Sequence, residues 1–478
     1  MRGKASILIA GLLALLALAG ATSAAAAPPP AAGLDPGFGQ GGRAFVPFSK
    51  PQRPSATSEL ATAVGADGSL FLGVGNTVER LDPNGQFDRA FGQDGAVKVT
   101  APSGDSFEIA ALAVDSQGRV VVAGTSLHES DRRPLSTIYG FEAYERTPTA
   151  ARIARLLPNG EPDPGFGEGG ALETVFGLPA PPPEEGGPGL SKAEVTVTGV
   201  AIGADDGIVV TGGAVTGRAY PCAGSVRSSL QSRLTYAAYV ARLTSSGSPD
   251  PGFGGDGIFG GRTVAENPLH IGTATAPAVG PDGSITYGSG YERCRNAELP
   301  ATPGLARLTA TGEWQPGFGE QDGIRGGFWQ WVPAPDGSIA AVNLTNWRER
   351  ETLNVVAFRA GATGLPDDSF GKNGTSRVTL RGPALHWSAT VALDPQGRVL
   401  LADSQAKKPW RGFALFRLRP DGTLERNFGP GGRFAIEVPE LSGAAHLILD
   451  PQGRALLLGE SRGARGEGVV VTRLLFSR

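Results

Sequence analysis

The chain has 478 residues, of which 40% are hydrophobic, and it contains 72 glycines and 38 prolines. A net charge of −3 excludes the basic footprint of a nucleic-acid-binding protein. The hydrophobic content is sufficient for packed cores, while so many glycines and prolines indicate frequent turns.

The first 27 residues are typical of an export signal. Arg2 and Lys4 precede an apolar stretch at 7–18, and the small residues at 21–27 offer cleavage sites. The apolar stretch is shorter than the roughly 20 residues of a membrane-spanning helix. An uncleaved anchor is the alternative. No later segment could span a membrane, so we expect a secreted or cell-envelope protein.

A phenylalanine followed by Gly-x-x-Gly, or by a close variant, recurs along the chain. A period of roughly 50 to 90 residues is typical of propellers, solenoids and arrays. We expect these rings to be equivalent core residues that pack between neighbouring repeats. The seven copies start at Phe38, Phe91, Phe166, Phe253, Phe318, Phe370 and Phe428.

Two further markers recur in phase with the phenylalanines. An Arg-Leu run ends in a turn glycine, as in ARLLPNG and ARLTSSG. An acidic or amide residue followed by glycine separates apolar runs, which predicts two strands joined by a tight turn. These pairs are Asp67-Gly68, Gln117-Gly118, Asp206-Gly207, Asp282-Gly283, Asp336-Gly337, Gln396-Gly397 and Gln452-Gly453. Each repeat therefore predicts four antiparallel strands, a to d, which is the pattern of a propeller blade.

The two ends of the chain predict a closed ring. The last repeat has strands a, b and c but no FGxxG, and residues 33–48 supply that missing piece. An open solenoid would instead carry atypical repeats at both ends. We predict an all-β fold: a seven-bladed β-propeller of four-stranded antiparallel blades at 34–478, closed by an N-terminal segment that completes the last blade. Residues 28–33 are expected to be a short linker.

These motifs resemble the delta-60 repeat family, secreted bacterial propellers with D-x-x-F-G-x-x-G and A-R-L-x-x-x-G signatures. The resemblance covers residues 34–478, and the strand order is also similar to that of NHL-type propellers. It departs in blade five, where the Arg-Leu run is degraded to FRAGATG, and in blade four, where GEQDG follows Phe318. The resemblance implies a propeller fold and export. It implies no catalytic residues.

Variation in loop length predicts one plain and one elaborated face. The a–b and c–d turns are short and nearly constant, whereas the b–c loops carry insertions at 125–149, 214–236 and 289–303. A long proline-rich d–a crossing lies at 177–194. Loops on a rigid scaffold usually carry binding function, so the b–c/d–a face is the predicted binding face.

Tyrosines and tryptophans concentrate in or beside these loops. Flat aromatic rings give contact area at a small entropy cost, which suits an interface. The alternative is that they pack the loops onto the blade rims. The predicted binding residues are Tyr139, Tyr144, Tyr220, Trp347, Trp387 and Trp410.

Common catalytic motifs such as GxSxG, HExxH, the Walker loop and CxxC are absent. Counting back seven residues from the a–b turn glycines places Gln330, Thr390 and His446 on three adjacent inner strands, with His386 near the channel mouth. These residues form a polar ligand site, in which His446 and His386 are the catalytic candidates, or they hydrogen-bond a channel water.

Cys222 and Cys294 are the only cysteines and lie in b–c loops of neighbouring blades. In an oxidising compartment we expect them to form a disulfide, with two free thiols as the alternative. Their spacing fits no metal motif, and no DxDxDG calcium loop is present. We expect neither a metal nor a cofactor.

Two function classes stay open. The favoured one is an exported, monomeric, non-enzymatic binding or scaffold propeller that engages a protein, peptide or glycan, with no nucleic-acid partner. The alternative is a hydrolase or lyase with a site at the central channel, which requires a cluster of carboxylates or histidines there.

Overall fold

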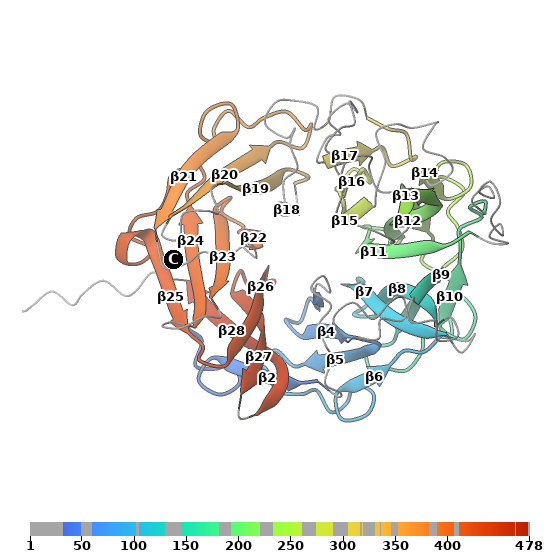
Figure 1. Ribbon diagram of the computed structural model, residues 1–478, viewed down its shortest axis with the longest axis horizontal. Helices are drawn as coiled ribbons and strands as arrows, with labels where there is room; N and C mark the ends of the chain where they lie inside the picture. The colour runs from blue at the N-terminus through green and yellow to red at the C-terminus, as the bar shows by residue number, and fades with distance from the viewer. Residues whose placement is uncertain are drawn as a thin grey trace, which may run out of the picture.

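Short antiparallel sheets are arranged in a ring around a central axis (Figure 1). The fold is a seven-bladed β-propeller, as the sequence predicted. The computed structural model describes residues 32–48, 60–101, 105–129, 146–180, 193–219, 233–260, 274–289, 305–315, 318, 330–334, 336–345, 352–381, 390–405, 411–463 and 465–476. Among these residues there is one short helical turn, η1 (Pro430–Gly432), and no helix is long and apolar enough to cross a membrane.

Within each blade the strands follow the chain from the axis outward. Blades one and two contain β3 (Ala61–Val64), β4 (Leu70–Val74), β5 (Thr77–Leu81), β6 (Ala96–Lys98), then β7 (Ser106–Val114), β8 (Val120–Glu129), β9 (Arg146–Leu156) and β10 (Ala171–Thr174). Blades three and four contain β11 (Val195–Ile202), β12 (Ile208–Ala219), β13 (Arg233–Leu243), β14 (Ile258–Gly260), then β15 (Ala274–Val279), β16 (Ile285–Ser289) and β17 (Leu305–Leu308). In blade four the described residues comprise these three strands.

The remaining blades follow the same order. Blades five and six contain β18 (Gln330–Pro333), β19 (Ile339–Thr345), β20 (Thr352–Ala360), β21 (Thr375–Arg381), then β22 (Thr390–Leu393), β23 (Val399–Gln405), β24 (Gly412–Leu418) and β25 (Arg433–Glu437). Blade seven contains β26 (Leu441–Leu449), β27 (Ala455–Gly463) and β28 (Gly466–Phe476).

An aspartate side chain stabilises each a–b turn by accepting backbone hydrogen bonds. In blade two the side chain of Asp115 accepts hydrogen bonds from the backbone N–H groups of Gln117 (3.0 Å) and Arg119 (2.9 Å). In blade one Asp67 does the same for Ser69 (2.9 Å). These bonds satisfy turn amides that the strand ladder leaves unpaired. The residue at the left-handed position is glycine, as at Gly118 with φ 75°.

The a–b turn of blade three differs from the prediction by one residue. Asp206, with φ 57°, occupies the left-handed position that glycine holds in the other blades, and Gly207 follows it. Aspartate tolerates this conformation better than most residues. The register of β11 therefore moves by one residue, so Gly199, paired with Thr211, is the equivalent of the inner-strand positions elsewhere.

Seven apolar clusters hold neighbouring blades together, one at each interface. Each cluster contains the phenylalanine of one FGxxG motif, and all seven rings are at most 4% exposed. The prediction that they are equivalent core residues is confirmed. In order around the ring the clusters contain Phe38, Phe91, Phe166, Phe253, Phe318, Phe370 and Phe428.

The signature glycine of the next blade makes room for this ring. A Cβ atom on Gly247 would lie 2.9 Å from the ring of Phe166, so a side chain there would force the ring to move. Beside it, the N–H of Gly167 donates to the carbonyl of Ser246 at 2.9 Å. The FGxxG motif of one blade and the c–d turn glycine of the next are therefore parts of one contact.

The N-terminal segment completes blade seven. The strands β1 (Ala32–Leu34) and β2 (Arg43–Pro47) both pair antiparallel with β28, and Figure 1 shows β2 beside β27 and β28. Between them the Asp35 carboxylate accepts a hydrogen bond from Arg473 Nε at 2.8 Å. Strand β1 begins at Ala32, so the paired segment starts within the stretch 28–33.

Truncating one repeat phenylalanine should cost much of the stability. For Phe166→Ala we expect a loss of about 3 to 5 kcal/mol, because the ring is fully buried and leaves a cavity. Chemical denaturation would measure it. The matched control is Phe87→Ala, whose ring is 37% exposed. Equal losses for both variants would contradict the role assigned to the buried ring.

Removing the closing segment should open the ring. Deletion of residues 28–50 leaves β28 with an unpaired edge and Arg473, whose side chain is 4% exposed, without Asp35. We expect unfolding or aggregation, measured by melting and light scattering. The milder Asp35→Asn variant should fold but melt lower than the parent. A deletion variant that melts like the parent would show that closure is unimportant.

Candidate functional site

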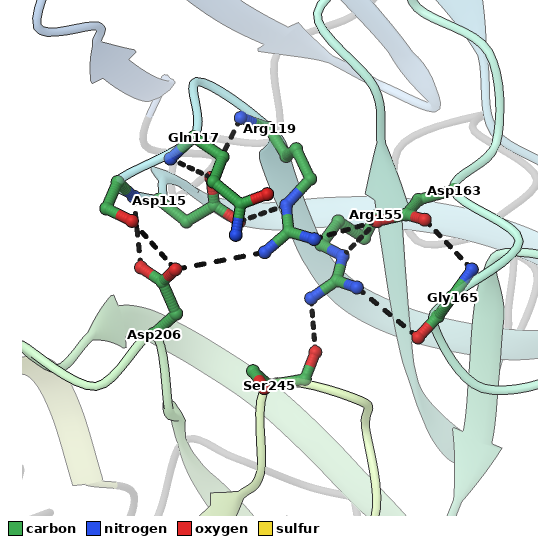
Figure 2. A network of polar contacts seen from close by, with 9 residues as sticks. Asp115, Gln117, Arg119, Arg155, Asp163, Gly165, Asp206 and Ser245 are labelled. Atoms are coloured by element: carbon green, nitrogen blue, oxygen red, sulfur yellow. Dashed lines mark hydrogen bonds and ion pairs between the residues drawn. The ribbon is translucent and has the colours of Figure 1, made fainter.

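Each strand c carries an arginine, and six of these seven arginines connect their own blade to the next. In blade two Arg155 donates from Nε to Asp163 at 2.7 Å, and its guanidinium carbon lies 4.8 Å from the ring centre of Phe166. Its Nη1 donates to the carbonyl of Ser245 in blade three (Figure 2). One side chain thus stacks on the core ring, neutralises the turn carboxylate and bridges two blades.

The same bridge recurs around the ring. The donors and the accepting carbonyls are Arg80 to Pro158, Arg155 to Ser245, Arg242 to Ala310, Arg307 to Ala362, Arg359 to Gly397 and Arg473 to Pro83. Blade five keeps its arginine although its Arg-Leu run is degraded, so that departure from the repeat pattern does not remove the contact.

Figure 2 shows that arginines and aspartates of the a–b/c–d face form a network of ion pairs and hydrogen bonds where blades two and three meet. Arg119 contacts Asp115 at 2.6 Å and Asp163 at 3.3 Å, and Asp206 of the next blade lies 3.9 Å away. Burial tends to raise the pKa of Asp163, but the N–H of Gly165 and the Arg155 guanidinium outweigh it, so the pKa lies below its usual range. The pKa of Asp206 is lowered as well, so Asp163 and Asp206 are ionised structural groups and not proton donors at neutral pH.

The predicted channel residues lie on three adjacent inner strands at equivalent register. Their Cα partners on strand b are Val342, Ala402 and Leu458 for Gln330, Thr390 and His446, respectively. Two of the three contact the next blade. Thr390 Oγ1 accepts the N–H of Leu447 at 3.3 Å, and His446 Nε2 accepts the N–H of Leu60 at 3.3 Å. The latter bond requires an unprotonated Nε2, so His446 serves here as a link between blades.

A carboxylate–imidazole pair that the sequence analysis missed lies in blade two. Asp105 Oδ1 lies 3.2 Å from His128 Nδ1, and Thr149 donates to Asp105 Oδ2 at 3.1 Å. The imidazole is 61% exposed, while the carboxylate is 15% exposed. A carboxylate that orients an imidazole in this way is the base-and-orienter arrangement of acid–base catalysis.

The pair was hidden by a β-bulge. Counting outward from the a–b turn places Asp105 opposite Glu129, but the bulge between Ile109 and Ala111 shifts the register by one and brings in His128. A bulge has no clear sequence signature, so the two residues did not stand out.

Two strand b–c hairpins extend far beyond that of blade one, on the face opposite the arginine network. Strands β8 and β12 have 10 and 12 residues, against 5 for β4 in blade one. At roughly 3.3 Å per residue, the excess is about 16 Å and 23 Å. The stretches 125–149 and 214–236 were predicted as loop insertions. This is wrong for the first and last residues of each stretch, which belong to the paired strands. The last pairs are Glu129 with Arg146 in blade two and Ala219 with Arg233 in blade three.

The other predicted site residues lie outside the described residues. They are Tyr139, Tyr144, Tyr220, Trp347, Trp387, Trp410, His386, Cys222 and Cys294. Among the residues that the structure does describe, no three His, Cys, Asp or Glu side chains come together as a metal site.

Comparison with known proteins identifies a β-propeller. The family described as "Domain of unknown function (DUF5122) beta-propeller" matches residues 141–166 and 235–253. Both segments run through a strand c and its turn to the FGxxG phenylalanine, so the match falls on the interblade signature of blades two and three. A search of curated proteins finds no match.

Several solved structures resemble the chain at low identity. The polysaccharide lyase Uly1 is 9% identical with a TM-score of 0.44, over 90% of this chain and 92% of that one. BBS1N, solved in complex with ARL6DN, is 10% identical with a TM-score of 0.40, over 91% and 98%. The endo-arabinase from Bacteroides thetaiotaomicron VPI-5482 is 10% identical with a TM-score of 0.29, over 58% and 93%. Such low values indicate neither a substrate nor an activity for this chain.

One buried carboxyl lies at the interface between blades seven and one. Glu79 on β5 precedes the interblade arginine and is 7% exposed, and its Oε2 has no hydrogen-bond partner among the described residues. It pairs with Leu72, which belongs to the apolar cluster of this interface. Burial raises the pKa of Glu79 to about 7. The equivalent residues of the other blades are uncharged: Ala154, Ala241, Ala306, Phe358, Phe416 and Thr472.

Glu79 should make the fold less stable as pH rises. In the unfolded chain the carboxyl loses its proton near the ordinary value of 4.5, whereas the folded chain keeps the proton until about pH 7. The contribution of the protonated Glu79 carboxyl to the free energy of unfolding is therefore complete below pH 4.5. It is lost as pH rises through 7, which lowers the free energy of unfolding by about 3 kcal/mol.

In Glu79→Gln we expect this pH dependence to disappear and the melting temperature at pH 8 to rise. Melting curves at pH 5 and pH 8 would measure both effects. Glu161→Gln, at an exposed turn, is the control and should behave like the parent. Parallel pH profiles for the parent and Glu79→Gln would contradict the assignment.

Proposed function

We propose that this chain is an exported, non-enzymatic binding or scaffold propeller of the delta-60 repeat type, which engages a protein, peptide or glycan through its b–c/d–a face. The observation that carries this proposal is the pair of long hairpins formed by β8 with β9 and by β12 with β13. They extend the b–c/d–a face of blades two and three beyond that of blade one.

The chemistry of the two faces supports this assignment. On the a–b/c–d face the strand-c arginines and turn carboxylates are engaged with one another and with backbone carbonyls. A charged group held in this way has little left to offer a ligand. Long hairpins instead present side chains on a rigid base, and Tyr139 and Tyr144 belong to the segment that joins β8 to β9.

The proposal includes export through residues 1–27, a monomer, and a disulfide between Cys222 and Cys294. Cross-linking of two neighbouring b–c loops would lower the entropy that those loops lose on binding a partner. Non-reducing peptide mapping of the exported protein should recover the linked pair.

The alternative function is a hydrolase or lyase. The observation that favours it is the Asp105–His128 pair, because its imidazole is exposed and oriented by a carboxylate. It lies near the outer end of the paired part of the blade-two hairpin, in a different blade from the predicted channel residues. Loss of turnover in His128→Ala, with His446→Ala still active, would support an enzyme at this place.

Shortening the blade-two hairpin tests the binding face. In this variant residues 127–149 are replaced by Gly-Asn, the two-residue turn of blade one. This turn then joins Ser126 to Ala150, which is its partner in the ladder. We expect capture of ligands on glycan and peptide arrays to fall at least about 30-fold, as for a hot spot of 2 kcal/mol or more, with little change in melting temperature.

Two further variants complete this test. Replacement of Trp347, Trp387 and Trp410 with alanine should weaken capture in the same way, because these rings are the predicted anchors. The control is Glu168→Lys on the a–b/c–d face, at an exposed position, which should bind like the parent. Capture that survives the shortened hairpin but not Glu168→Lys would assign binding to the wrong face and overturn the proposal.

A further inference from the structure

A groove lies at the outer rim between blades five and six. It has a volume of about 1280 Å³ and is bordered on one side by β21 and on the other by the c–d turn of blade six. With seven residues, β21 is the longest outermost strand among the described residues, where β2, β6, β10, β14 and β25 have three to five.

The free edge of β21 lines this groove. The strand pairs with β20 on one side and, among the described residues, has no strand partner on the other. Its five consecutive residues 376–380 all border the groove. Neighbouring side chains of a strand point to opposite faces, so a surface that all five border includes the backbone edge between them. Such an edge offers N–H and C=O groups to another strand.

The groove has an apolar floor and a basic rim. The buried Leu380 and Phe416 lie at its floor, with the half-buried Val378 and Leu424 beside them. On the rim Arg419 lies 3.4 Å from Thr423 Oγ1.

Arg419, Arg426 and Arg377 are exposed, and none of the three lies within ion-pair distance of a described carboxylate. Hydrogen bonds first, and the charge of Arg419 after them, lower the pKa of Asp421 and Glu425. The three arginines therefore differ from most strand-c arginines, which form ion pairs with turn carboxylates at the contacts between blades. The one acidic residue at the groove, Asp421, already accepts the backbone N–H of Thr423 at 2.8 Å and its hydroxyl at 2.7 Å.

We propose that this groove binds an acidic peptide in extended conformation, which adds as a further strand to the free edge of β21. The backbone of the peptide would pair with β21, its apolar side chains would face the floor, and its acidic side chains would reach the arginines at the rim, Arg377, Arg419 and Arg426. This site lies on the rim of blades five and six, apart from the hairpins of blades two and three. It therefore does not depend on the proposed function.

The combination of features favours a peptide over an acidic polysaccharide. Both ligands would be attracted by the arginines, but only a peptide backbone has donors and acceptors spaced to match a strand edge. Along β21 the buried or half-buried Ser376, Val378 and Leu380 alternate with the exposed Arg377 and Thr379, which matches the two-residue period of an extended peptide. A carbohydrate chain would leave the edge of β21 unused.

The test uses a fluorescent octapeptide of alternating aspartate and valine, with binding to the mature protein followed by anisotropy. We expect saturable binding that weakens as salt rises, and no binding of the same peptide with lysine in place of aspartate. Arg419→Gln combined with Arg426→Gln should weaken binding at least about tenfold, while the melting temperature stays unchanged. Arg89→Gln, at the same turn position as Arg426 but in blade one, is the matched control and should bind normally.

Methylation of the peptide backbone tests strand addition directly. Alternate amides of an added strand face β21, and the others face solvent. N-methylation of one alternate set should therefore abolish binding, and N-methylation of the other set should leave it. Equal tolerance of both sets would overturn the proposal. So would capture of an oligogalacturonate, with every octapeptide unbound, because the groove would then recognise acidic glycans.

Discussion

The ring depends on its seven strand-c arginines. Six of them donate to a carbonyl of the next blade, and five lie over an FGxxG phenylalanine. In blade two Arg155 makes both contacts, and Phe166 beneath it is fully buried. A propeller blade is a small sheet with too little apolar surface to be stable alone, so its stability comes from its neighbours. The repeat signature is therefore conserved between blades as an interface, with each half supplied by a different blade.

This constraint explains what happens where the ring closes. Blade seven takes its outer strand from the N-terminal segment, so it has no c–d turn to receive the arginine of blade six. Phe476 packs there instead, 5.9 Å from Phe428 between ring centres, and Arg417 lies over both rings. The Nη1 of Arg417 is buried with no hydrogen-bond partner among the described residues. On the other side of the same blade, Arg473 donates to Asp35, as Arg155 does to Asp163 in blade two. Here the two residues come from opposite ends of the chain.

The engagement of charge in these contacts also divides the surface. On the a–b/c–d face the strand-c arginines are engaged with turn carboxylates and backbone carbonyls, whereas Arg419 and Arg426, at the c–d turn of blade six, form no ion pair with a described residue. Arg419 and Arg426 are conspicuous there because most arginines near the turns serve the blade contacts. The two proposed binding regions therefore follow from one cause: they lie where the side chains are not needed to hold the ring together.

The sequence by itself determined the number of blades, the strand order, the seven core phenylalanines and the composite last blade, because each depends on local turn chemistry and on a pattern repeated seven times. It located the inner-strand residues Thr390 and His446, but not their bonds to Leu447 and Leu60 in the next blade. Only the tertiary structure decided the Asp105–His128 pair, the paired ends of the long hairpins and the groove beside β21. A bulge that shifts register by one, a ladder that continues into an insertion and a gap between two blades all depend on contacts between distant segments. No local pattern of residues encodes such contacts.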